Sequence, residues 1–182
     1  MMRAFSLIEI VIVIALSVCM MLVLCFTIYQ LNGTVAYQQT VIQSSGSAST
    51  VVREIESLTF PADAVLQTHT FPSATYASSA TTLVLEIPSI DSSGNAIANT
   101  YDYAAFYVVG INAYRILASN VSSKRVSGTK KLSTTVTSLS FAYNNADFTQ
   151  VSAVTVDVQT QAQVKQNVLS DHRHEQFWLR NF

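Results

Sequence analysis

The N-terminal part of the chain is dominated by one unbroken apolar segment. Phe5 to Ile28 is a run of 24 residues with a single charged side chain, Glu9, and with neither proline nor glycine. As an α-helix the run would be about 36 Å long, which exceeds the roughly 30 Å hydrocarbon thickness of a bilayer. The pattern predicts a membrane-spanning helix.

Three interpretations of such a run compete. A cleaved secretory signal has a shorter apolar core and a small-x-small site after it, whereas Tyr29-Gln30-Leu31-Asn32 follows here. A buried core helix conflicts with the size of the remaining chain, because about 150 residues can hardly surround it. A signal anchor fits better, with Arg3 on the cytoplasmic side.

Glu9 is the anomaly of the apolar segment. A carboxylate costs about 2.5–3.5 kcal/mol at the bilayer centre and less near the interface. One interpretation places Glu9 at headgroup depth, stabilised by the positive end of the helix dipole. The other is that it meets a positively charged partner when the chain leaves the lipid. The residues alone leave both open.

The pattern after Ile28 is amphipathic. One apolar stripe recurs at spacings near seven or its parts, and it is expected to pack on the chain's own domain: Leu31, Val35, Ile42, Val52 and Ile55. Pro61 ends the pattern, so the helix is predicted from Phe5 to about Leu58, roughly 80 Å long. Gly33 and Gly46 weaken it, and a bend or break is expected at Ser44–Ser49.

The period changes to that of β-strands from Leu83 onward. Strands are expected at Leu83–Pro88, Tyr101–Val109, Ala113–Leu117, Leu139–Tyr143, Val154–Val158 and Phe177–Leu179. Turns are expected at Asp91–Asn95 and Gly110–Asn112. Residues 60–83 show no clear period. The predicted fold class is α+β, with a long N-terminal hydrophobic helix packed on a mainly antiparallel β domain.

Composition and charge limit the classes of function that the chain can have. The chain has 182 residues, ten Lys+Arg against eleven Asp+Glu, and only 12% charged residues. This balance argues against nucleic acid as the main partner. The one locally basic stretch is interpreted as a solvated loop: Lys124, Arg125, Lys130 and Lys131. Cys19 and Cys25 both lie in the apolar run, on poorly matched helix faces, which favours apolar packing over a disulfide.

Candidate sites for chemistry are sparse. On a strand His172 and His174 would share a face and supply two ligands for zinc or copper. Two ligands are insufficient, and His69 is distant along the chain. Asp171–Glu175 is therefore interpreted as a polar surface connection. Asp91–Asn95 lacks the ligand density of a calcium site and is interpreted as a turn, with calcium binding left open as the alternative. Asn32-Gly33-Thr34 and Asn120-Val121-Ser122 fit the N-glycosylation triplet, but the pattern by itself carries little weight. No enzymatic motif, cofactor, metal or small-molecule substrate is expected.

The segment Phe5-Ser6-Leu7-Ile8-Glu9-Ile10-Val11-Ile12-Val13-Ile14-Ala15 resembles the N-terminal signature of type IV pilins and of the pseudopilins of type II secretion. In that class a short basic leader is cut just before a Phe, the new amino terminus is methylated, and Glu is the fifth mature residue. Arg3, Phe5 and Glu9 match these positions. Ala4 departs from the usual Gly before the cut, although it is also small.

The resemblance implies a leader at 1–4, a membrane and filament-core helix at 5–28, an amphipathic continuation at 29–60 and a pilin-like α+β globular domain at 61–182. It implies cleavage between Ala4 and Phe5 by a prepilin peptidase, and methylation of Phe5. It also implies an assembly role for Glu9, which would attract the new amine of a neighbouring pilin or pseudopilin subunit. The inner membrane would hold the chain, N-terminus cytoplasmic, until it enters a periplasmic or extracellular filament.

A second resemblance is to the larger J-type minor pseudopilins and their minor pilin counterparts. It rests on the expected helix-then-strands order and on the terminal Leu179-Arg180-Asn181. Two alternatives stay open. The chain is an uncleaved bitopic membrane protein with an extracytoplasmic binding domain, or it is a tip adhesin or DNA-uptake pilin, for which Lys124–Lys131 is the candidate surface.

Overall fold

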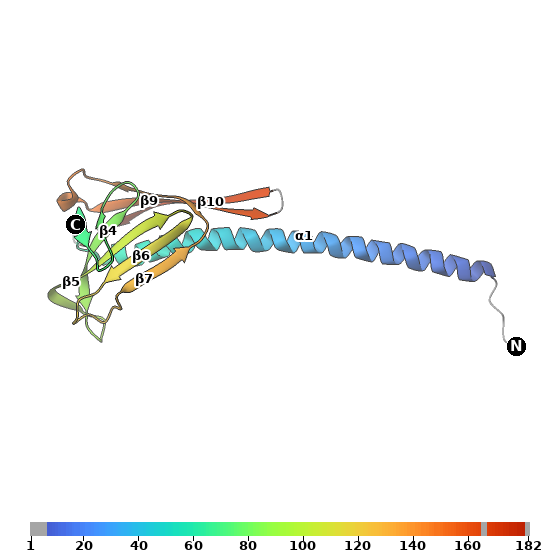
Figure 1. The fold of residues 1–182 in the computed structure, drawn as a ribbon, viewed down its shortest axis with the longest axis horizontal. Helices are drawn as coiled ribbons and strands as arrows, with labels where there is room; N and C mark the ends of the chain where they lie inside the picture. Colours follow the sequence, from blue (N-terminus) through green and yellow to red (C-terminus); the bar gives the residue numbers. More distant parts are fainter. Residues whose placement is uncertain (1–6, 165–166, 181–182) are drawn as a thin grey trace. The chain divides into compact units, whose positions relative to one another are not determined.

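The structure is a computed structural model that describes residues 7–164 and 167–180. It divides into two compact units, Met1–Thr40 and Val41–Phe182, each of which is described by itself. One helix, α1, spans Leu7–Thr59 (Figure 1). Mainly antiparallel strands follow it, so the predicted α+β class, with a long apolar N-terminal helix, is confirmed.

The helix runs without interruption through Gly33 and through Ser44–Ser49, so the predicted bend or break there is wrong. Ser44 and Ala48 are buried in this stretch. Ser44 also meets Thr160 of β9 (Ala153–Val164), with 3.1 Å between the two hydroxyl oxygens. Burial of small side chains against a strand outweighs the weak helix propensity of serine and glycine. The helix ends before Pro61, as predicted.

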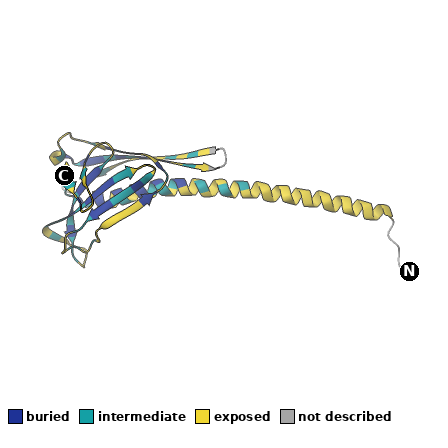
Figure 2. Cartoon of the chain, viewed as in Figure 1, coloured by how far each residue is buried: buried dark blue, intermediate teal, exposed yellow. Residues whose placement is uncertain are grey.

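The buried face of α1 within the second unit is Ser44, Ala48, Val51, Val52, Ile55, Leu58 and Thr59. Val52 and Ile55 of the predicted stripe belong to this face. Ile42 does not, because the residue is 71% exposed. Leu31 and Val35 lie in the first unit. The predicted stripe is therefore wrong at Ile42, and the first buried residue of α1 is Ser44. The N-terminal half of the helix is exposed (Figure 2).

The strands form three antiparallel sheets. The orders are β1-β4-β5-β6-β7, β10-β9-β8 and β2-β3. The remaining bounds are β1 (Ala64–Val65), β2 (Thr68–Thr70), β3 (Thr75–Ala77), β4 (Leu83–Ile90), β5 (Ala96–Val109), β6 (Asn112–Ala118), β7 (Gly128–Ser133), β8 (Val136–Tyr143) and β10 (Asn167–Trp178), with a short 3-10 helix, η1 (Phe148–Gln150), before β9.

The predicted strands correspond to β4, β5, β6, β8, β9 and the end of β10, and both predicted turns are present. The turn between β5 and β6 pairs Val109 with Asn112 and places Gly110 at a φ of 62°. That left-handed conformation favours glycine. Strands β1, β2, β3 and β7 were not predicted, and β10 begins ten residues before the predicted Phe177.

The main core of the second unit lies between the last turns of α1 and the two larger sheets. Phe106, Ile55, Leu83, Leu85 and Ile87 are fully buried in it. A smaller cluster packs with Tyr76 of β3 and with two tyrosines of β5, and its members are Phe71, Val84, Ala105 and Ile116. The second unit therefore has a hydrophobic core of its own.

Candidate functional site

The N-terminal part of α1 presents apolar side chains that the chain itself does not cover. Its exposed large hydrophobic residues are Leu7, Ile8, Ile10, Val11, Ile12, Val13, Ile14, Leu16, Val18, Met20, Met21, Leu22, Val23, Leu24, Phe26 and Ile28. Among the described residues, α1 is the one helix long and apolar enough to cross a membrane. A continuous exposed apolar surface of this kind requires lipid or protein around it.

The polar side chains within this stretch are compatible with an apolar environment. The Ser17 and Thr27 hydroxyls donate to the carbonyl oxygens of Val13 and Val23, each at 2.8 Å, which satisfies them inside their own helix. Cys19 and Cys25 are both free thiols on the exposed helix surface. The stretch therefore exposes few groups that need water.

Glu9 lies in the first turn of α1, and its residue is exposed. The positive end of the helix dipole stabilises a carboxylate at this position. The next charged residue along the chain is Arg53. Glu9 is therefore the one charge on more than 40 residues of helix. The predicted processing residues Ala4 and Phe5 lie outside the described residues.

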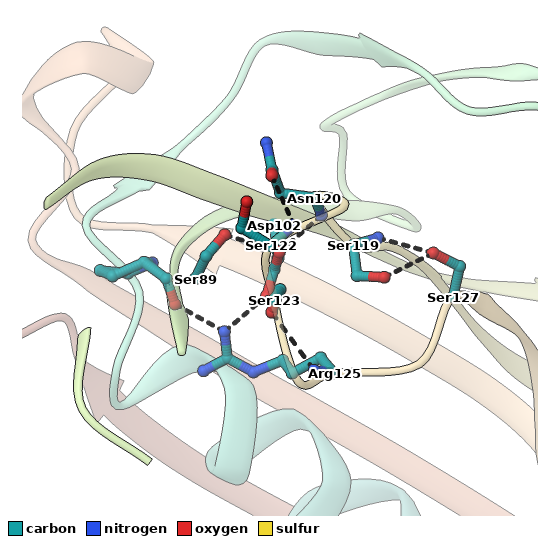
Figure 3. Close-up of polar contacts among 9 residues, drawn as sticks. Ser89, Asp102, Ser119, Asn120, Ser122, Ser123, Arg125 and Ser127 are labelled. Carbon is teal, nitrogen blue, oxygen red and sulfur yellow. Dashed lines mark hydrogen bonds and ion pairs between the residues drawn. The ribbon is translucent and has the colours of Figure 1, made fainter. Parts of the chain in front are cut away.

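A buried polar network holds the loop between β6 and β7 (Figure 3). The Asp102 side chain, fully buried on β5, accepts hydrogen bonds from Ser89 Oγ at 2.7 Å and Ser123 Oγ at 2.6 Å. It also accepts from the backbone N–H of Asn120 and forms a 2.8 Å ion pair with Arg125 Nη1. Burial by itself would raise the pKa of Asp102, but these hydrogen bonds outweigh it and hold that pKa below its ordinary value.

The basic residues are not grouped as one loop. Arg125 is 15% exposed and paired with Asp102, while Lys130 lies in β7 and pairs with Glu54 of α1 at 2.8 Å. Lys124 Nζ donates to the Ser92 carbonyl oxygen, and Lys131 lies over the Tyr114 ring. The interpretation as a single loop is wrong, because residues 128–131 form a strand. Lys124, Lys130 and Lys131 are exposed, as expected for solvated residues, although each cation has a partner within the chain.

The interpretation of Asp171–Glu175 as a polar surface connection is also wrong, because the segment lies in β10. His172 Nε2 and His174 Nδ1 lie 2.7 Å and 3.3 Å from Asp157 Oδ2 on the neighbouring strand. The hydrogen bond with His172 is the main reason that the pKa of Asp157 lies below its ordinary value. Within residues 7–164 and 167–180, no group of three or more His, Cys, Asp or Glu side chains is placed to hold a metal ion.

The turn at Asp91–Asn95 uses its carboxylate internally. Asp91 Oδ1 accepts the backbone N–H groups of Ser93 and Asn95 at 2.8 Å and 2.9 Å. The bond from Asn95 is the main cause that lowers the pKa of Asp91. An Asx turn of this kind explains the aspartate without a cation.

Sequence reasoning missed the Asp102 network. Its members come from β4, β5 and the loop after β6, and no spacing along the chain links them.

The comparisons with known proteins add no assignment: no family model, no curated protein and no solved structure matches the chain.

Proposed function

We propose that the chain is a structural subunit, a minor pilin or pseudopilin, of a type IV pilus or a type II secretion pseudopilus. In this proposal a prepilin peptidase cleaves between Ala4 and Phe5, and Phe5 is then methylated. The subunit waits in the inner membrane with its N-terminus cytoplasmic. It leaves the lipid by transferring its apolar helix into the core of a filament made of sister subunits.

The observation that carries the proposal is the exposed apolar surface of α1 from Leu7 to Ile28, with Glu9 as its one charge. Lipid and a bundle of like helices are both apolar, so the helix moves between them at little cost in burial. The signature Phe5–Ala15 specifies the processing step. The separate core of the second unit supports a domain that stays folded while the helix changes surroundings.

Glu9 supplies what apolar packing lacks, which is a fixed register. A uniformly apolar helix can slide along its neighbours with little change in contact. A carboxylate paired with the new amine of a neighbouring Phe5 fixes one position, because the attraction is strong at low dielectric and an unpaired carboxylate is penalised there. The proposed role of Glu9 is therefore to dock and align the incoming subunit.

The test compares Glu9→Val, Glu9→Gln and Ser17→Ala in cells that assemble the filament. Ser17 lies on the same helix and its hydroxyl bonds only within that helix in the described structure, so its removal is a matched control. We expect all three variants to insert in the membrane. Incorporation into sheared filaments, measured by immunoblot, should fall at least tenfold for both Glu9 variants and stay normal for Ser17→Ala. Normal incorporation of Glu9→Val would refute the docking role.

The alternative, an uncleaved bitopic membrane protein, predicts a different result for processing. Its chain keeps residues 1–4 in the presence of an active prepilin peptidase.

The basic residues give no support to a DNA-uptake role, because Arg125 and Lys130 form ion pairs with Asp102 and Glu54.

A further inference from the structure

The loop between β6 and β7 contains a tight turn at Asn120-Val121-Ser122-Ser123. The Ser123 N–H donates to the Asn120 carbonyl oxygen at 3.0 Å, which closes the turn. The Asn120 side-chain oxygen accepts the Ser122 N–H, also at 3.0 Å, and forms an Asx turn. Val121, at the tip, is fully exposed. The triplet Asn-Val-Ser therefore sits at the surface in a defined conformation.

The buried network fixes this turn from below. Asp102 accepts the Asn120 N–H at 2.8 Å and the Ser123 hydroxyl at 2.6 Å. Both of these contacts use groups other than the Asn120 amide nitrogen and the Ser122 hydroxyl. The network thus holds the turn outward without occupying the two groups that define the triplet.

The Asn120 amide nitrogen and the Ser122 hydroxyl are both accessible to a modifying enzyme. Within the described residues, neither Asn120 Nδ2 nor the Ser122 hydroxyl makes a hydrogen bond, and both residues are exposed. The Asn120 amide nitrogen points away from the Asp102 network (Figure 3). An accessible asparagine amide two residues before an accessible serine hydroxyl is the requirement for an N-glycan acceptor.

The chain carries an internal comparison at Asn32-Gly33-Thr34. This triplet lies inside α1, where the Thr34 N–H belongs to the helical ladder and is not available to the Asn32 side chain. The Thr34 hydroxyl donates to the Gln30 carbonyl oxygen at 3.1 Å. Asn32 therefore has the residue pattern but not the turn or the free hydroxyl.

We propose that Asn120 is an acceptor site for an N-linked oligosaccharide, and that Asn32 is not. In the transfer, Asn120 Nδ2 attacks the first sugar carbon of a lipid-linked oligosaccharide, and a carbon–nitrogen bond forms. The bond from that carbon to the lipid phosphate oxygen breaks, the lipid phosphate leaves with the electron pair, and Nδ2 loses one proton to a base of the oligosaccharyltransferase. The inference rests on one element of the proposed function, export of the second unit across the membrane.

The test expresses the full chain in a host that contains a lipid-linked oligosaccharide and an oligosaccharyltransferase that recognises the bare Asn-x-Ser/Thr triplet. The variants are Asn120→Gln, Ser122→Ala, Ser122→Thr and Asn32→Gln. Intact mass and peptide mapping should show one glycan on the native chain, on Ser122→Thr and on Asn32→Gln. The glycan should be absent from Asn120→Gln and from Ser122→Ala, which retains the asparagine and the turn backbone.

An unmodified native chain, in cells that fully modify an exported reporter with the same triplet, would overturn the inference. A glycan that persists in Asn120→Gln, or that disappears in Asn32→Gln, would do the same. The N-terminus of the same samples separates the two proposals. A glycosylated chain left uncleaved by a co-expressed prepilin peptidase refutes the filament proposal alone, and a cleaved chain without glycan refutes the acceptor site alone.

Discussion

The Asp102 network should dominate the stability of the loop and sheet around it, and Asp102→Asn is the sharpest perturbation. Asp102 Oδ1 accepts from Ser89 Oγ and from the Asn120 N–H, and Oδ2 accepts from Ser123 Oγ and Arg125 Nη1. An asparagine must turn its NH2 group toward one of these pairs of donors. The serine hydroxyl of that pair can reverse its role and accept from the NH2 group, but the other donor, the Asn120 N–H or the Arg125 guanidinium, loses its acceptor. In either orientation the mostly buried Arg125 is left without its counter-charge.

Breaking a buried ion pair by removing one partner costs about 3–5 kcal/mol. At an m-value of about 2 kcal/mol per M urea, the unfolding midpoint of Asp102→Asn should fall by about 2 M. The matched control is Asp171→Asn, because Asp171 pairs with Arg173 at 3.2 Å on the surface and such pairs contribute about 1 kcal/mol or less. Near-UV circular dichroism of the full chain in detergent reports the transition.

The Asp102→Asn variant also changes how the free energy of unfolding depends on pH. The pKa of Asp102 is lowered in the folded protein. The ionised carboxylate therefore contributes its full stabilisation above the unfolded-state pKa of about 3.9, and this stabilisation is lost as pH falls through the lower folded-state pKa. The native chain should therefore lose stability on acidification below pH about 4 more steeply than Asp102→Asn. Equal midpoints for Asp102→Asn and Asp171→Asn at pH 7 would refute the reasoning.

Three further changes test the helix and the core. Gly46→Ala should stabilise the protein by about 1 kcal/mol in urea unfolding, because an added Cβ meets no atom within 4 Å and alanine favours a helix interior; a destabilised variant would contradict this. Phe106→Ala should cost about 3–5 kcal/mol by the same assay, since Phe106 is fully buried, and a loss under 1 kcal/mol would contradict the assigned core. Reductant should leave the melting temperature of the monomer unchanged, because Cys19 and Cys25 are free thiols, and a lower melting temperature would indicate a disulfide.

The parts of the fold that sequence reasoning predicted depend on strong local signals. Pro61 ends the helix, and Gly110 supplies the left-handed conformation of the β5–β6 turn. The alternation of β8 and β9 comes from one buried and one solvated face. Each of these features is decided by residues that are neighbours along the chain.

The parts that were missed depend on tertiary contacts. Ser44 and Ala48 remain helical because they are buried on α1, with Ser44 bonded to Thr160 more than a hundred residues away. The part of β10 before Phe177 carries Asp171 and Arg173 where a buried strand would carry apolar residues, so it has no hydrophobic alternation. The Asp102 network joins distant segments in the same way, and no local pattern marks it.

The most direct test of the filament account is the intact mass and N-terminal sequence of the membrane-extracted protein, with and without a co-expressed prepilin peptidase. The account predicts a chain that begins at Phe5 and carries one added methyl group only when the peptidase is present. A chain that keeps residues 1–4 in both conditions would contradict it, and the helix would then be a permanent membrane anchor.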